Sequence, residues 1–224
     1  VQWSVESLFE WRIDETYTVR NTLRYSSIEF EGKTAFGGGL QDDMRTLNRF
    51  GFGNSLDLKV FTMDTNASAV FRTGSVEHSV LVGVDYSESE STIVSGFAMA
   101  PSIDVFQPVY GATIPDLFTY YDTRQPTSLL GVYAQDHMKL GTRVVGTLSG
   151  RYDWTELTTD DRIGKTSTEQ DPSKFSGRVG LTYLFDSGVA PYASYSTSFL
   201  PTPGVNFYGQ PFDPTTGEQI EGGL

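Results

Sequence analysis

VQWSVESLFEWR, residues 1–12, decides the fold class. Its odd positions hold five apolar residues out of six, whereas its even positions hold one. Because successive side chains of a strand point to opposite faces, this alternation predicts a β-strand with one apolar and one polar face. The same pattern recurs in FTMDTNASAVFR, residues 61–72, and in residues 175–185. No stretch shows helical periodicity, so the sequence predicts an all-β chain.

Eight segments show this alternation, and their connections are asymmetric. The expected strands are residues 1–12, 17–26, 61–72, 80–87, 129–138, 144–154, 175–185 and 192–199. The expected short turns contain Asp14-Glu15, Gly74, Gly141 and Gly188, and the expected long loops are residues 27–55, 94–127, 157–173 and 200–217. A soluble sandwich also alternates faces, but its strands are usually about 5–6 residues long. Longer strands with alternately short and long connections favour a transmembrane antiparallel up-and-down β-barrel.

Aromatic spacing on the apolar face supports the barrel interpretation. Phe61 and Phe71 lie ten residues apart, and so do Phe175 and Phe185. Such a step covers about 33 Å along a strand and about 25 Å along the axis of a barrel whose strands tilt by about 40°. This matches the lipid-facing band between two aromatic girdles, although aromatic residues also favour strands in general. The expected girdle residues are Trp11, Tyr17, Phe71 and Phe185 at the short-turn rim, and Trp3, Tyr86, Tyr152 and Trp154 toward the long-loop rim.

Charged residues occupy mid-strand positions on the opposite face. They are Arg20, Arg24, Asp64, Arg72, Arg151, Asp153 and Arg178. Mid-strand charges are tolerated only where the interior is polar, so we expect a lumen that is filled with water or with another polar domain.

Composition excludes several classes of protein. The 224 residues include 16 Lys plus Arg and 28 Asp plus Glu, which gives a net charge of −12, and no Cys. A nucleic-acid partner, a disulfide scaffold and a cysteine nucleophile are therefore excluded. The two histidines, His78 and His137, lie on different expected strands, so no metal site is expected. The acidic pairs at 42–43 and 160–161 lack the spacing of an EF-hand and indicate solvated loop tips.

We expect residues 1–224 to be an internal part of a longer protein and part of a single transmembrane β-barrel domain, with the remaining strands absent. The chain begins inside one alternating segment and stops as another begins, near residues 217–224. A barrel of eight strands fills itself with side chains, whereas one of about 22 strands encloses a plugged lumen. Four long loops within eight strands favour the larger barrel.

Six motifs occur in an order that resembles TonB-dependent siderophore receptors, and the ferrichrome-type receptors in particular. They are YTVRNTLRY (17–25), HSVLVGVDY (78–86), GVYAQD (131–136), GRYDW (150–154), GRVGLTYLFDSGVAPYASYSTSF (177–199) and GEQIEGGL (217–224). The resemblance implies a 22-stranded barrel with an N-terminal plug in the Gram-negative outer membrane, surrounded by lipid. It also implies import of a ferric siderophore, with the hydroxamate type favoured, driven by the TonB complex through the plug, which is absent here.

The resemblance further implies which residues bind the ligand. Phe36 and Phe97 occupy places where aromatic side chains near the outer mouth contact the siderophore; the alternative is that they pack loop against barrel wall. A second aromatic residue expected two positions after Phe36 is Gly38 in this sequence, which puts the identity of the siderophore in doubt. The iron is already chelated, so no catalytic residue, metal ligand or cofactor is expected.

The stretch 101–126 is rich in aromatic residues and prolines. Its aromatic residues are Phe106, Tyr110, Phe118, Tyr120 and Tyr121. A long loop of this composition favours a small core of its own, with a contribution to the outer vestibule as the alternative.

Two other functions remain open at the level of the sequence. One is a passive diffusion porin, whose permeability is set by pore size and charge. The other is a soluble β-rich ligand-binding module.

Overall fold

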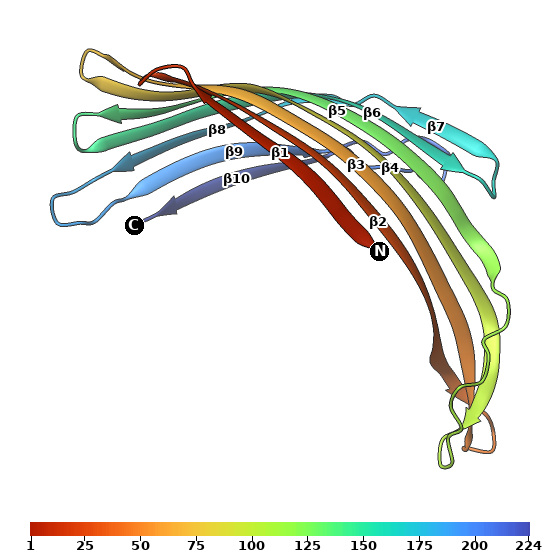
Figure 1. Cartoon of the computed structure of the whole chain (residues 1–224). Helices are drawn as coiled ribbons and strands as arrows, with labels where there is room; N and C mark the ends of the chain where they lie inside the picture. The colour runs from red at the N-terminus through yellow and green to blue at the C-terminus, as the bar shows by residue number, and fades with distance from the viewer.

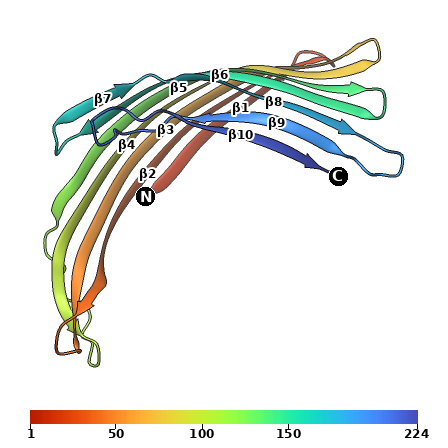
Figure 2. The same cartoon turned by 180° about the vertical axis from the view of Figure 1, so that it is seen from behind.

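The chain forms one antiparallel sheet of ten strands, and the computed structural model describes residues 1–224. Neighbouring strands follow chain order, except that β7 pairs only with β6. The sheet is strongly curved and is not closed, with β1 and β10 at its edges (Figures 1 and 2). No helix is present that could span a membrane. The strands are β1 Gln2–Arg12, β2 Tyr17–Leu40, β3 Thr46–Thr73, β4 Val76–Asp104, β5 Phe118–Leu140, β6 Val144–Asp161, β7 Thr166–Gln170, β8 Ser173–Tyr183, β9 Tyr192–Leu200 and β10 Thr215–Gly223.

This topology confirms the prediction of an all-β, antiparallel up-and-down chain. The four short turns also lie where the sequence predicts them. Gly74, Gly141 and Gly188 have φ angles of 63°, 60° and 86°, a left-handed conformation in which a side chain would be strained. The tight hairpins therefore depend on glycine at these positions.

The predicted extent of the loops and the count of eight strands were wrong. β2 and β3 continue to a connection of residues 41–45 only, and β4 and β5 are joined by residues 105–117. β7 was not expected as a strand, and β10 corresponds to the alternating segment that was expected to begin near residues 217–224. The cause is that backbone pairing does not require apolar alternation, which is needed only where one face meets a core or lipid. The expected small core in residues 101–126 is also absent, because Phe106 and Tyr110 are 73% and 78% exposed.

Register divides the side chains cleanly between the two faces, because directly paired residues point to the same face. Tyr25, Phe61 and Val132 lie on the apolar face, whereas Arg24, Asp64 and Asp153 lie on the polar face. The β3–β4 pairing is uninterrupted from Arg49 opposite Ala100 to Thr73 opposite Val76. The face of each side chain is therefore fixed along almost the whole hairpin.

Aromatic pairs gather at two levels of the apolar face, as predicted. Trp3–Tyr25 and Tyr152–Trp154 lie toward the long extensions, with ring centroids 5.5 and 4.7 Å apart. Tyr183–Phe185 lies at the short-turn end, with centroids 4.7 Å apart, and Phe71 stacks there on His78 at 5.1 Å. His78 also contacts the Asp136 carboxylate at 2.6 Å, so this histidine has structural partners.

Two glycines open space for long polar side chains on the polar face. A Cβ at Gly83 would lie 2.4 Å from Cζ of Tyr133, so the tyrosine ring crosses the strand directly above this glycine. The Tyr133 hydroxyl then donates a hydrogen bond of 2.6 Å to Oδ2 of Asp64 on β3. The Gly83 of HSVLVGVDY and the Tyr133 of GVYAQD thus meet in one contact.

The second glycine, Gly131, serves Arg151 in the same way. A Cβ at Gly131 would lie 2.0 Å from Nη2 of Arg151. The guanidinium crosses this gap to Asp85, with one hydrogen bond of 2.8 Å, while its Nε donates to Asp153 at 2.6 Å. Because the three side chains are 31%, 26% and 8% exposed, the ion pairs are partly shielded from water. These motif residues therefore form a polar network that extends from β3 to β6.

We predict that Gly131→Ala destabilises the barrel by about 1–3 kcal/mol, because the added methyl group displaces the Arg151 guanidinium from Asp85. The measurement is urea unfolding of the purified receptor that contains this chain. Gly180→Ala is the matched control on the same face, since its Cβ would have no neighbour closer than 3.6 Å. Equal midpoints for the two variants would contradict this role of Gly131.

Candidate functional site

The outer halves of β2–β5 extend beyond the rest of the sheet and bend away from it (Figure 1). An ion pair links the tips of these strands. Nε of Arg45 donates a hydrogen bond of 2.5 Å to Oδ2 of Asp104, and this contact joins the β2–β3 turn to the end of β4. The turn itself is held by Asp43, which accepts hydrogen bonds from the backbone of Arg45 and from Thr46. The hydrogen bond from the Thr46 hydroxyl lowers the pKa of Asp43, and Arg45 lowers the pKa of Asp104.

Both predicted binding residues lie on the polar face of these extensions. Phe36 on β2 pairs directly with Phe50 on β3, and their ring centroids are 5.7 Å apart. Phe50 in turn lies 5.4 Å from Phe97 on β4. Phe36 and Phe97, which are 61 positions apart in the sequence, therefore belong to one row of rings that is linked by Phe50.

Three more aromatic residues extend this row toward β5. Phe97 pairs directly with both Phe52 and Phe118, so all three share a face. Tyr120 lies 6.3 Å from Phe52, next to an irregularity in the β4–β5 register. We define the aromatic patch as Phe36, Phe50, Phe52, Phe97, Phe118 and Tyr120.

The patch remains accessible in the folded chain. Phe36 and Phe97 are 47% and 37% exposed, and Phe118 and Tyr120 are 76% and 50% exposed. A contiguous set of exposed rings is uncommon on a protein surface unless something binds there. Rings provide a large rigid contact area at low entropic cost, which suits a bulky apolar or uncharged ligand.

The glycine at position 38 is also explained. A Cβ at Gly38 would lie 2.6 Å from Cε2 of Phe50, so the Phe50 ring occupies the space above this residue. The Phe50 ring therefore fills the space that a larger side chain at position 38 would need. The absence of an aromatic side chain at position 38 leaves no gap in the row of rings.

Apart from Asp104 at the tip, which is paired with Arg45, the charged side chains on the outer halves of β2–β5 lie on the face opposite the patch. Register places them with Phe61 and Tyr25 rather than with Phe50 and Phe97. They are Glu29, Glu31, Lys33, Arg49, Asp57, Lys59, Glu88, Glu90, Asp122 and Arg124. Between the patch and the Asp64 network, the polar face of these strands carries uncharged residues, such as Ser91 and Gln125, apart from Arg24 beside the network. The same strands thus offer an uncharged surface on one side and a charged surface on the other.

The patch consists almost entirely of hydrocarbon rings. No group of three His, Cys, Asp or Glu side chains could hold a metal ion anywhere in the chain. The aromatic patch holds no acid, base or nucleophile other than the Tyr120 hydroxyl.

Sequence reasoning missed Phe50 and Phe52 because both fall in a stretch that was expected to be a loop. The signal was present in FGFGN, residues 50–54, where two aromatic residues alternate with glycines. The same period of two that identified the other strands identifies this one.

Comparison with known proteins gives the family. The family model described as "TonB dependent receptor-like, beta-barrel" matches residues 2–224. The ferrioxamine B receptor of Salmonella typhimurium is 34% identical over 226 residues, which cover 100% of this chain and 31% of that protein. The ferrichrome outer membrane transporter/phage receptor of Escherichia coli K12 is 30% identical over 241 residues, which cover 96% of this chain and 32% of that protein. The chain therefore spans about a third of the length of these relatives.

Solved structures agree on the fold. The ferric-catecholate import receptor Fiu of Escherichia coli K12, in its closed form, superposes with a TM-score of 0.86 at 18% identity, over 99% of this chain and 37% of that chain. The siderophore receptor PiuA of Acinetobacter baumannii gives a TM-score of 0.83 at 15% identity, over 99% of this chain and 36% of that chain. This chain belongs to the TonB-dependent receptor β-barrel family, a family of outer-membrane receptors of Gram-negative bacteria and not of enzymes.

Proposed function

We propose that this chain forms part of the outer mouth of a TonB-dependent importer of ferric siderophore, and that the ligand is of the hydroxamate type. The observation that carries the proposal is the exposed, uncharged aromatic patch on the polar face of β2–β5. Ferrioxamine B and ferrichrome, which appear in the names of two relatives, are both hydroxamate siderophores.

The charge of the chelate supports the hydroxamate type over the catecholate type. Three singly charged hydroxamate groups neutralise Fe³⁺, whereas three doubly charged catecholate groups leave a strongly negative chelate. A negative ligand requires cationic partners when it leaves water. Arg49, Lys33 and Arg124, the cations nearest in sequence to the patch residues, all lie on the other face. The patch therefore suits a chelate with little net charge.

Within this proposal, Phe36 and Phe97 contact the chelate, and Phe50 lies between them as a third contact. The apolar face between its two aromatic levels contacts the lipid of the outer membrane. Energy from the TonB complex reaches the barrel through a plug domain. The iron arrives already coordinated, so the barrel supplies no metal ligand and requires no cofactor.

Substitution of the central ring tests the binding site. We predict that Phe50→Ala raises the Kd for ferrioxamine B about tenfold, because it removes the ring that joins the row and leaves Gly38 uncovered. The measurement is quenching of tryptophan fluorescence in the purified receptor. Thr92→Ala, on the opposite face of the neighbouring strand, is the control and leaves the Kd unchanged. An unaltered Kd for Phe50→Ala would remove the patch from the binding site.

A charge placed on the patch face tests the preference for an uncharged chelate. Met99 pairs with Phe50 and is 60% exposed. We predict that Met99→Lys raises the affinity for a ferric catecholate relative to ferrioxamine B by about tenfold, because it supplies the missing cation. Thr92→Lys adds the same charge on the other face and should leave the ratio unchanged. Equal ratios in both variants would show that charge on this face does not select the ligand.

Uptake tests the transport part of the proposal. Cells that carry the receptor should accumulate iron from ferrioxamine B only when the TonB complex is intact, while binding persists without it. Uptake that is independent of TonB, together with high conductance in a planar bilayer, would favour a passive porin instead.

A further inference from the structure

The connection between β4 and β5, residues 105–117, crosses the face opposite the aromatic patch. We call this segment the strap. Its side chains are exposed except for Ile114 and Leu117, which are half-buried. From Pro108 to Leu117, its one hydrogen bond to the rest of the chain is donated by Nζ of Lys33 to the Ile114 carbonyl, at 3.4 Å. The Ile114 and Leu117 side chains therefore provide almost all of the contact between residues 108–117 and the sheet.

These two side chains occupy a groove that exists because three residues lack a Cβ. We call Gly51, Gly53 and Gly96 the glycine groove. A Cβ at Gly51 would lie 2.4 Å from Cγ2 of Ile114, and a Cβ at Gly53 would lie 2.4 Å from Cδ1 of Leu117. A Cβ at Gly96 would lie 2.7 Å from Cβ of Leu117.

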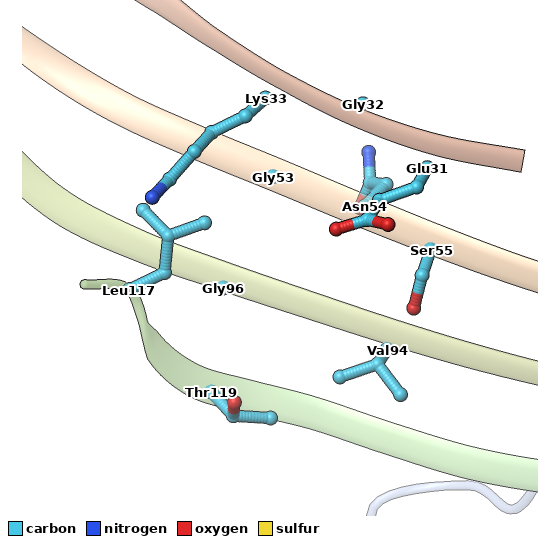
Figure 3. Close-up of a pocket in the computed structure, with 10 residues that line it drawn as sticks. All are labelled: Glu31, Gly32, Lys33, Gly53, Asn54, Ser55, Val94, Gly96, Leu117 and Thr119. Carbon is cyan, nitrogen blue, oxygen red and sulfur yellow. The ribbon is translucent and has the colours of Figure 1, made fainter. Parts of the chain in front are cut away.

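Figure 3 shows the pocket beside this contact, with Leu117 next to Gly96 and the Lys33 side chain reaching toward it. Gly53 and Gly96 are paired across β3 and β4, so the groove runs across two strands. Any larger side chain at these positions would force the strap outward. The three glycines thus provide the space into which Ile114 and Leu117 pack.

The strap leads directly into the patch. Leu117 lies in the groove on one face, and the next residue, Phe118, pairs with Phe97 on the other face. Tyr120 follows at the irregularity in the register and reaches Phe52. Because alternate residues of a strand point to opposite faces, the position of Leu117 determines where Phe118 points.

We propose that Leu117, seated in the glycine groove, is a positioning residue for ligand binding, which fixes Phe118 and Tyr120 in the aromatic patch without touching the ligand. This inference rests on the proposed function for its ligand, but the anchoring contact does not. Without the anchor, the first residues of β5 are free to fray, since they stand at the end of a segment with few other contacts. The ligand must then order Phe118 and Tyr120 when it binds, and this loss of conformational entropy lowers the affinity.

The first experiment tests the anchor without ligand. Residues 1–224 contain no cysteine, so Gly96→Cys with Leu117→Cys adds the one cysteine pair in this part of the receptor, and its Cβ atoms are close enough to bridge after a small shift. We expect the disulfide to form in the intact receptor under mild oxidation. Val109→Cys, on an exposed part of the strap, replaces Leu117→Cys in the control pair and should not cross-link. Failure of the first pair to cross-link, or equal yields from both pairs, would overturn the anchor.

The second experiment measures binding of ferrioxamine B to the intact receptor. Leu117→Ser should raise the Kd roughly three- to tenfold, the cost of ordering one or two side chains. Leu117→Met should restore tight binding, and Val109→Ser should leave the Kd unchanged. In a receptor that already carries Phe118→Ala and Tyr120→Ala, Leu117→Ser should add almost nothing, because its effect acts through those rings.

The cross-linked receptor supplies the decisive comparison. When oxidised, it should bind ferrioxamine B as tightly as the unmodified receptor, and after reduction it should bind as weakly as Leu117→Ser. A Leu117→Ser effect that is fully additive with the ring substitutions, or no effect at all, would overturn the positioning role. A receptor that cross-links as expected but binds no ferrioxamine B would instead contradict the proposed ligand and leave the anchor established.

Discussion

The uninterrupted register of the β3–β4 hairpin is the constraint on which the rest of the structure depends. From Thr73 to Arg49, every residue of β3 has a direct partner on β4. A slip of one residue would exchange all side chains between the two faces. The apolar face with its aromatic levels, the polar network and the aromatic patch are consequences of one continuous alternation. The β3–β4 hairpin thus keeps the apolar and polar faces separate from the short turns to the outer tips.

Glycines determine where side chains from neighbouring segments pack on this sheet. Gly83 and Gly131 let Tyr133 and Arg151 cross a strand to reach carboxylates, and Gly38 leaves room for the Phe50 ring. On the opposite face, the glycine groove receives the strap. In each case the missing Cβ allows a larger side chain from a neighbouring segment to occupy the surface of the sheet. These glycines therefore act through packing between strands, whereas Gly74, Gly141 and Gly188 act through the backbone conformation of the turns.

The sequence predicts the membrane-level part of the fold well, because there the two faces meet different surroundings and the apolar alternation is strong. The four short turns, three of which contain glycine, follow from the same pattern. It fails for the outer halves of β2–β5, where neither face is required to be apolar, so residues such as Glu29 and Lys33 give no alternating signal. The same failure hides Phe50 and Phe52 in an expected loop. Phe36 and Phe97 could be named from the resemblance, but the ring that joins them and the strap that leads into Phe118 depend on pairing between strands far apart in sequence.

The separation of an uncharged aromatic surface from a charged surface on the same four strands is what gives the proposed site its preference for a weakly charged chelate. A structure of the intact receptor with ferrioxamine B bound tests this most directly. We expect the chelate to lie on the polar face, with Phe50 and Phe97 in van der Waals contact. A chelate bound to Lys33, Arg124 or their neighbours on the opposite face, with none of the patch rings in contact, would contradict it.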